Sequence, residues 1–77
     1  MTPQERDRFL VRDGDEIVMK LSSRRAAIDH ARACARKQGR DYELEDSQAL
    51  PGAVSLWSVR PSGLIQAIEL RTVEQAS

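Results

Sequence analysis

Between residues 22 and 39 the apolar residues recur at spacings of three and four. They are Ala27, Ile28, Ala31, Cys34 and Ala35. On an α-helix this spacing gathers them on one stripe, so the pattern predicts an amphipathic helix within residues 22–39, at about 23–38. Ser22 or Ser23 is suited to cap its first turn, and Gly39 is suited to end it. Because the stripe is mostly alanine, we expect the helix to lie flat on a sheet.

Residues 8–21 contain two apolar runs around a Gly-centred acidic turn, which predicts a β-hairpin. Two registers are open. A two-residue loop, which the turn chemistry favours, puts Phe9 with Val18 on one face. A three-residue loop groups Phe9, Val11, Ile17 and Met19 on one face. We favour the second register, because it also sets Arg12 opposite Glu16.

After the helix, acidic residues alternate with tyrosine and leucine over residues 41–46, DYELED. This alternation predicts a third strand with one solvated, acidic face. Residues 47–53 follow as a loop, which we expect to be the most mobile segment. Residues 54–71 form the last hairpin, and their Pro61-Ser62-Gly63 sequence suits a three-residue loop with a bulge.

The strands of the last hairpin are apolar on both faces. The predicted loop places Val54, Leu56, Ile68 and Leu70 on one face and Trp57, Val59, Ile65 and Ala67 on the other. Since a single helix covers only one face, we expect a second cover, which is the N-terminal segment, the loop, a second copy or a partner protein. We expect the partner-binding surface to lie on the outer face of this hairpin, away from the helix, and to be formed by Trp57, Val59, Ile65 and Ala67, with Trp57 at the contact.

Length and composition indicate one small folded domain over residues 1–77. The chain is 31% charged and 40% hydrophobic, which is typical of a folded domain. Residues 1–7 are expected to be a tail or a short helical turn over 3–7. No apolar run is long enough to span a bilayer, and the only cysteine is Cys34, so we expect a cytoplasmic protein.

The chain has no net charge, but its charges are segregated. Residues 22–40 carry six basic residues against one acidic residue, and residues 41–46 carry four acidic residues. On the predicted helix Arg25, Arg32 and Arg36 share one face, where they are suited to bind phosphates or an acidic partner. Nucleic-acid binding is therefore the alternative function. The single Trp, Tyr and Phe provide no evident stacking platform for bases.

Three patterns that carry enzymatic chemistry elsewhere are better explained structurally here. His30 and Cys34 stand four apart on the helix, but a closed zinc site needs four ligands and the chain has no other His or Cys. The same pair lacks an orienting group for nucleophilic catalysis. The acids of residues 41–46 fit a solvated strand face. We therefore expect no metal, no cofactor and no enzymatic activity.

The order strand, Gly turn, strand, then Ser-Ser-x-x-Ala-Ala-Ile-x-x-Ala-x-x-x-Ala-x-x-x-Gly, then strand resembles small uncharacterised bacterial and phage domains of ββαββ type. The resemblance covers about residues 8–46 and brings no activity or functional residues with it. The hairpin at 54–71 is longer than that pattern. Small phage-encoded inhibitors of host defence, including anti-CRISPR proteins, are similar in size and general make-up.

Together these patterns predict an α+β domain of order ββαβββ, with one antiparallel sheet and a single amphipathic helix packed on one face. The expected function is a non-catalytic protein-interaction module, a small bacterial or phage accessory or inhibitor protein. It would act through self-association as a homodimer or through a protein partner. Nucleic-acid binding by the arginine face remains the alternative.

Overall fold

The structure is a computed structural model that describes residues 8–73. The elements follow the order β1 (Phe9–Asp13), β2 (Glu16–Leu21), α2 (Arg24–Gln38), β3 (Tyr42–Asp46), β4 (Val54–Val59) and β5 (Ile65–Leu70). The predicted α+β fold of order ββαβββ is confirmed. The short helical turn expected over residues 3–7 lies outside the described residues.

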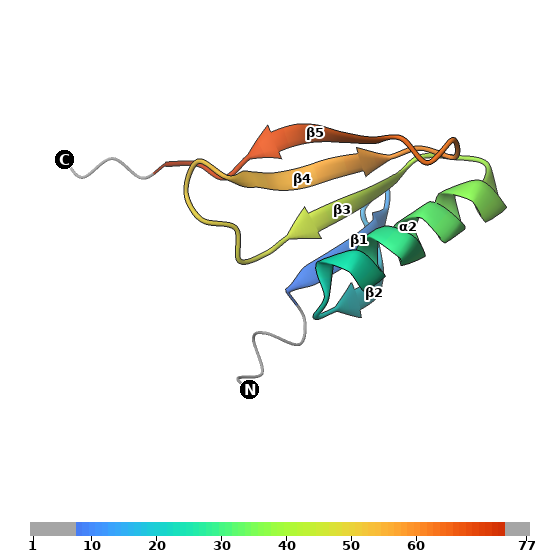
Figure 1. The fold of residues 1–77 in the computed structure, drawn as a ribbon, viewed down its shortest axis with the longest axis horizontal. Coiled ribbons are helices and arrows are strands. Elements are labelled where there is room, and N and C mark those ends of the chain that lie inside the picture. The colour runs from blue at the N-terminus through green and yellow to red at the C-terminus, as the bar shows by residue number, and fades with distance from the viewer. Residues whose placement is uncertain (1–7, 74–77) are drawn as a thin grey trace.

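The five strands form one antiparallel sheet in the order β2-β1-β3-β4-β5. Strands β2 and β5 are its edges, and the acidic strand β3 is its centre. Helix α2 lies across one face of this sheet, beside β1 and β3, whereas β5 lies farthest from it (Figure 1). The molecule therefore has two layers, and the other face of the sheet carries no helix.

The ends of α2 follow the sequence signals. Ser23 is the N-cap, and its side chain accepts a hydrogen bond from the Ala26 N–H at 3.3 Å. Gly39 adopts the left-handed conformation with φ of 68°, and its N–H donates to the Ala35 carbonyl at 2.8 Å. The helix predicted at about 23–38 is therefore confirmed.

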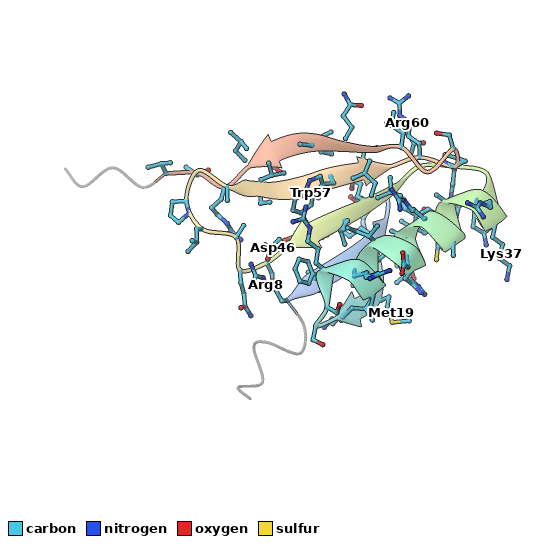
Figure 2. The ribbon with its side chains drawn as sticks, viewed as in Figure 1. Arg8, Met19, Lys37, Asp46, Trp57 and Arg60 are labelled. Atoms are coloured by element: carbon cyan, nitrogen blue, oxygen red, sulfur yellow. The ribbon has the colours of Figure 1, made fainter. Side chains whose placement is uncertain are left out.

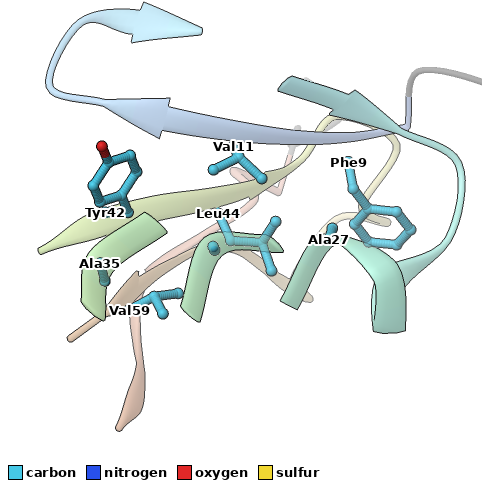
Figure 3. Close-up of a cluster of buried hydrophobic side chains, with 8 residues drawn as sticks. Phe9, Val11, Ala27, Ala35, Tyr42, Leu44 and Val59 are labelled. Carbon is cyan, nitrogen blue, oxygen red and sulfur yellow. The ribbon is translucent and has the colours of Figure 1, made fainter. Parts of the chain in front are cut away.

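The core lies between α2 and the three central strands. Ala27, Ala31 and Ala35 are fully buried on the helix side. They pack against large side chains from the sheet, as Figure 3 shows: Phe9, Val11, Tyr42, Leu44 and Val59. Small side chains on the helix let its backbone approach the sheet closely, as the alanine stripe predicted.

The register favoured for the first hairpin is wrong. Asp13 lies opposite Glu16, so the turn has two residues, and Arg12 lies opposite Ile17 and not opposite Glu16. The register then shifts before Val11, which pairs with Met19. Such a bulge adds one residue to β2, so a tight turn coexists with Phe9, Val11 and Met19 on one face. Arg12 instead forms an ion pair with β3, the neighbour of β1 on the side away from β2, and its Nε donates a hydrogen bond to Glu45 at 2.7 Å.

The three-residue loop of the last hairpin is confirmed. Arg60 donates to the Leu64 carbonyl at 2.9 Å, and Gly63, with φ of 93°, donates to the Arg60 carbonyl at 2.8 Å. Val59 pairs with Ile65, and Trp57 pairs with Ala67, so each pair shares a face as expected. The register then shifts twice toward the end of β5.

Our placement of this apolar set on the face away from the helix is wrong. Trp57 and Val59 stand opposite Leu44 and Tyr42 of β3, which face α2. Val59 is consequently fully buried in the core. The helix-free face instead carries the concavity lined by polar and acidic side chains together with Leu56 and Leu70, and Leu70 is 60% exposed.

The loop that we expected to be the most mobile is fastened at both ends. The Ser47 N–H donates to the Arg8 carbonyl at 2.8 Å, and Ala49 is buried. Arg71 donates from its guanidinium to the Ser47 carbonyl at 2.9 Å, while its backbone pairs with Gly52 and Ala53. These bonds join the loop to β1 and to the end of β5.

Candidate functional site

A groove runs along the boundary between α2 and β5. It is lined by Arg24, Arg25, Ile28, Asp29, Arg32 and Ile65. The five helical residues are spaced by one or by three and four, so they share one side of α2. We call this feature the basic groove.

One end of the basic groove lies above Trp57. The guanidinium carbon of Arg24 is 5.2 Å from the centroid of the Trp57 ring, within the range of a cation–π contact. Trp57 is half-buried and extends from β4 toward the helix layer (Figure 2). The contact explains why an arginine occupies the first turn of α2, where the helix dipole disfavours positive charge.

The other end of the basic groove is held by Arg32. Its Nε donates a hydrogen bond to the Gly63 carbonyl at 3.1 Å, which ties the middle of α2 to the loop of the last hairpin. This exposed contact links the helix to the loop that precedes β5. The groove is therefore bounded at each end by an arginine of α2 that touches the β4–β5 hairpin.

The sheet surface beside the basic groove is apolar and only partly covered. Ile65 and Trp57 are half-buried, and Ala67, opposite Trp57 on β5, is exposed. Helix α2 packs chiefly on β3 and β1 and less on β2 and β4. The helix-side surface of the β4–β5 hairpin is thus an apolar strip beside a row of arginines.

The two layers carry opposite charge. Arg24, Arg25 and Arg32 line the groove against the single carboxylate of Asp29. The concavity on the helix-free face has Glu43, Glu45 and Glu69 with Arg12 and Arg71 among its lining residues. A neutral chain therefore presents a basic side and an acidic side, which steers charged partners to different faces.

The structure brings together most of the residues singled out from the sequence, although they come from two separate predictions. Arg25 and Arg32 share the basic groove with Ile65, and Trp57 and Ala67 lie beside it. Val59 belongs to the core and is not accessible. Arg36 is exposed one turn beyond Arg32 and is not among the lining residues.

The sequence places Arg24 near the predicted arginine face, but we did not count it among the site residues. Its signal was present, because two arginines in the first turn of a helix oppose the helix dipole. The sequence pattern could not predict that Trp57 lies beneath Arg24, because that position depends on the register between β3 and β4. Ile28 and Asp29 were likewise not assigned to a site.

The carboxylates with shifted pKa values lie outside the basic groove. Burial would raise the pKa of Asp46, but hydrogen bonds from Arg8 and the Gln48 N–H, with the charges of Arg8 and Arg71, lower it below its ordinary value. Arg8 binds this carboxylate with two nitrogens, at 2.9 and 3.1 Å (Figure 2). The pKa of Asp13 is lowered mainly by its hydrogen bond from Arg40. The Arg8–Asp46 and Arg40–Asp13 ion pairs are therefore structural contacts between different parts of the fold.

The His30 and Cys34 pair gains no further metal ligands within the part of the chain that the structure describes. Within residues 8–73, no three His, Cys, Asp or Glu side chains come together as a metal site would require. Cys34 packs half-buried against the core. Over the same residues, the structure contains no helix of the length and apolarity needed to cross a membrane.

No family model, no curated protein and no solved structure matches this chain. The resemblance to small ββαββ domains therefore stays a prediction. The fold and the groove define the chain as a small two-layer α+β domain with an open basic and apolar surface between its helix and its last hairpin.

Proposed function

We propose that this domain is a non-catalytic protein-interaction module that binds an acidic, partly apolar segment of a partner protein in the basic groove. The observation that carries the proposal is the placement of Arg24, Arg25 and Arg32 beside Trp57 and Ile65. Arginine and tryptophan are the side chains most often found at the energetic centre of protein interfaces.

The apolar surface and the charged side chains make different contributions to binding. The apolar strip of Trp57, Ile65 and Ala67 supplies area to be buried, at about 25 cal/mol per Å². The arginines supply attraction over longer distances, which raises the association rate and selects acidic partners. The groove is lined by cations, aliphatic side chains and one carboxylate. This lining is better suited to binding a partner than to catalysing a reaction.

Nucleic acid is a weaker fit to this surface. Single strands bind to proteins by stacking bases on exposed aromatic rings. Trp57 is half-buried and already has the Arg24 guanidinium over its ring, and the neighbouring floor residues Ile65 and Ala67 are not aromatic. Phosphate attraction by the arginines alone would be sequence-independent and steeply salt-dependent.

A second copy of the chain is also a weaker fit on this side. Two-fold contact between helices would bring Arg24, Arg25 and Arg32 of both copies together, and like charges across an interface are unfavourable. The exposed end of β5, which carries Ile68 and Leu70, is the edge that a second copy would use for self-association. Such self-association would not involve the basic groove.

The test uses Trp57 as an intrinsic probe, since it is the only tryptophan. A peptide of glutamate and leucine and a single-stranded oligothymidylate are each titrated against wild type and against Arg25→Glu/Arg32→Glu. The matched control is Lys20→Glu/Lys37→Glu, which changes the net charge equally at two exposed positions outside the groove.

We expect the peptide to bind wild type and the control alike and to bind the groove variant about tenfold or more weakly, a loss of about 1.4 kcal/mol. Equal weakening in both variants would mean that net charge alone drives binding. Tighter binding of the oligothymidylate than of the peptide, lost in the groove variant, would establish the nucleic-acid alternative. A peptide that binds none of the proteins contradicts the proposal.

A further inference from the structure

We infer that the segment bound in the basic groove is an amphipathic α-helix with an acidic flank, lying alongside α2 on the helix-side surface of β4 and β5. This inference rests on the proposed function and specifies the conformation of the partner. It follows from three properties of the strip of sheet that α2 leaves uncovered. These are its width, the apolar sheet residues that form its floor, and the charge of the α2 side chains that form its wall.

The width of the sheet calls for a second helix. Neighbouring strands are about 4.8 Å apart, so five strands extend over roughly 19 Å between the outer axes. A helix with its side chains is about 10 Å wide, and α2 is centred on β1 and β3. Because α2 also contacts β4 and fully buries Val59, the strip that remains lies over β5 and the part of β4 around Trp57, and it is close to one helix wide.

The floor of this strip suits the apolar stripe of a helix. Trp57 and Ile65 are half-buried and Ala67 is exposed, so a large side chain, a branched one and a small one form an uneven apolar surface. Ile28 of α2 continues this surface up the helix wall. Leucines spaced by three and four on a docked helix would pack against such a surface as two helices pack on a sheet.

The wall of the strip requires negative charge on the partner. Arg24, Arg25 and Arg32 line the groove with only Asp29 among them, so they would lie along one flank of the docked helix. A copy of α2 itself cannot fill the strip favourably, because its own groove side carries the same arginines. The charge therefore selects a foreign, acidic helix over a second copy of this chain.

A strand added to the edge of β5 is the main competing geometry. Edge strands offer unpaired backbone groups to a partner strand. Such a strand would lie outside the sheet, beside β5 and away from α2, and would leave the arginines of the groove without a role. The helical geometry uses the floor and the wall together.

Three synthetic probes without tryptophan separate these geometries. The first is a helical peptide of about 15 residues, the length of α2, with leucines at three- and four-residue spacing and glutamates along one flank. The second keeps the same leucines and glutamates, but two alanines from the centre of the first peptide are replaced by proline, which breaks the helix. The third is the (dT)12 oligonucleotide. Trp57 emission gives the affinity, and amide chemical shifts of the ¹⁵N-labelled domain give the location.

We expect the helical peptide to bind about tenfold or more tightly than the proline peptide, with a blue shift of Trp57 emission and shifts in β4, β5 and the first half of α2. Arg25→Glu/Arg32→Glu should lose this binding, and Lys20→Glu/Lys37→Glu should keep it.

The failures are distinguishable. If the proline peptide binds equally well in the same groove, the proposed function stands and the helical inference is wrong. If the shifts are confined to the outer edge of β5, strand addition replaces the helical geometry. If neither peptide binds, or only (dT)12 does, both the inference and the proposed function fail.

Discussion

At the scale of single residues, Arg24 is the side chain that links the helix to the binding surface. Its guanidinium lies over the Trp57 ring, whereas Arg25 occupies the same turn without a ring contact in the described residues. Both arginines oppose the helix dipole by a few tenths of a kcal/mol. The cation–π contact offsets this cost for Arg24 only.

Replacement of each arginine by alanine separates these effects. We expect Arg25→Ala to leave the free energy of unfolding unchanged or to raise it slightly, and Arg24→Ala to lower it by about 0.5–1 kcal/mol relative to Arg25→Ala. Urea unfolding followed by circular dichroism gives both values. Equal stabilities would show that the Arg24–Trp57 contact contributes nothing.

Asp46 makes a pH-dependent contribution at the same scale. Because its pKa is lower in the folded chain than in the unfolded chain, its contribution to stability is complete above about pH 5 and is lost as the pH falls toward the folded pKa. Asp46→Asn should lower the free energy of unfolding at neutral pH by about 0.5–1.5 kcal/mol, since the buried carboxylate loses its charge-assisted hydrogen bonds from Arg8. It should also flatten the fall in stability between about pH 5 and pH 2.

The control for this pH dependence is Asp15→Asn, which removes the same charge from an exposed turn position. Its acid-side profile should follow the wild type. If Asp46→Asn retains the full acid-side slope, the Asp46–Arg8 pair is not the source of that slope.

At the scale of elements, the alanine stripe of α2 sets the distance between the two layers. Ala31 is fully buried among the core side chains, while Ala33 on the same helix is exposed. Ala31→Leu should therefore lower the free energy of unfolding by about 1–3 kcal/mol through overpacking. Ala33→Leu should change it by less than about 0.5 kcal/mol, as measured by urea unfolding. Equal effects would contradict the close packing of α2.

The elements themselves were largely predictable, because each has local signals. Ser23 and Gly39 bound the helix, and the Pro-Ser-Gly loop specifies the last hairpin. The register of the first hairpin was not predicted, because a two-residue turn is combined with a bulge in β2. The alternation of apolar residues does not reveal such a bulge.

The helix-facing side of β4 could not be read from its own sequence. Val54 to Val59 is apolar at positions that point to both faces, so periodicity gives the two sets and not their direction. The direction comes from pairing with β3, where Tyr42 and Leu44 are apolar and their neighbours are acidic. Applying the one-sided pattern of β3 to its neighbour would have placed Trp57 and Val59 under the helix.

At the scale of the whole molecule, one helix on five strands leaves the domain asymmetric in both cover and charge. The helix layer is basic, the helix-free face carries acidic residues, and the helix-side surface of β5 and of Trp57 is only partly covered beside the arginines. As a result, the apolar surface and the arginine surface, which the sequence predicted separately, lie side by side.

The most direct test of this account is the quenching of Trp57 fluorescence by iodide and by caesium at low ionic strength. The basic groove predicts that the anion quenches more efficiently than the cation, relative to free N-acetyltryptophanamide, because Arg24, Arg25 and Arg32 concentrate anions near the ring. The preference should fall in Arg25→Glu/Arg32→Glu, fall at high salt, and persist in Lys20→Glu/Lys37→Glu. Equal quenching by both ions, or a preference for caesium in the wild type, would contradict an open basic surface around Trp57.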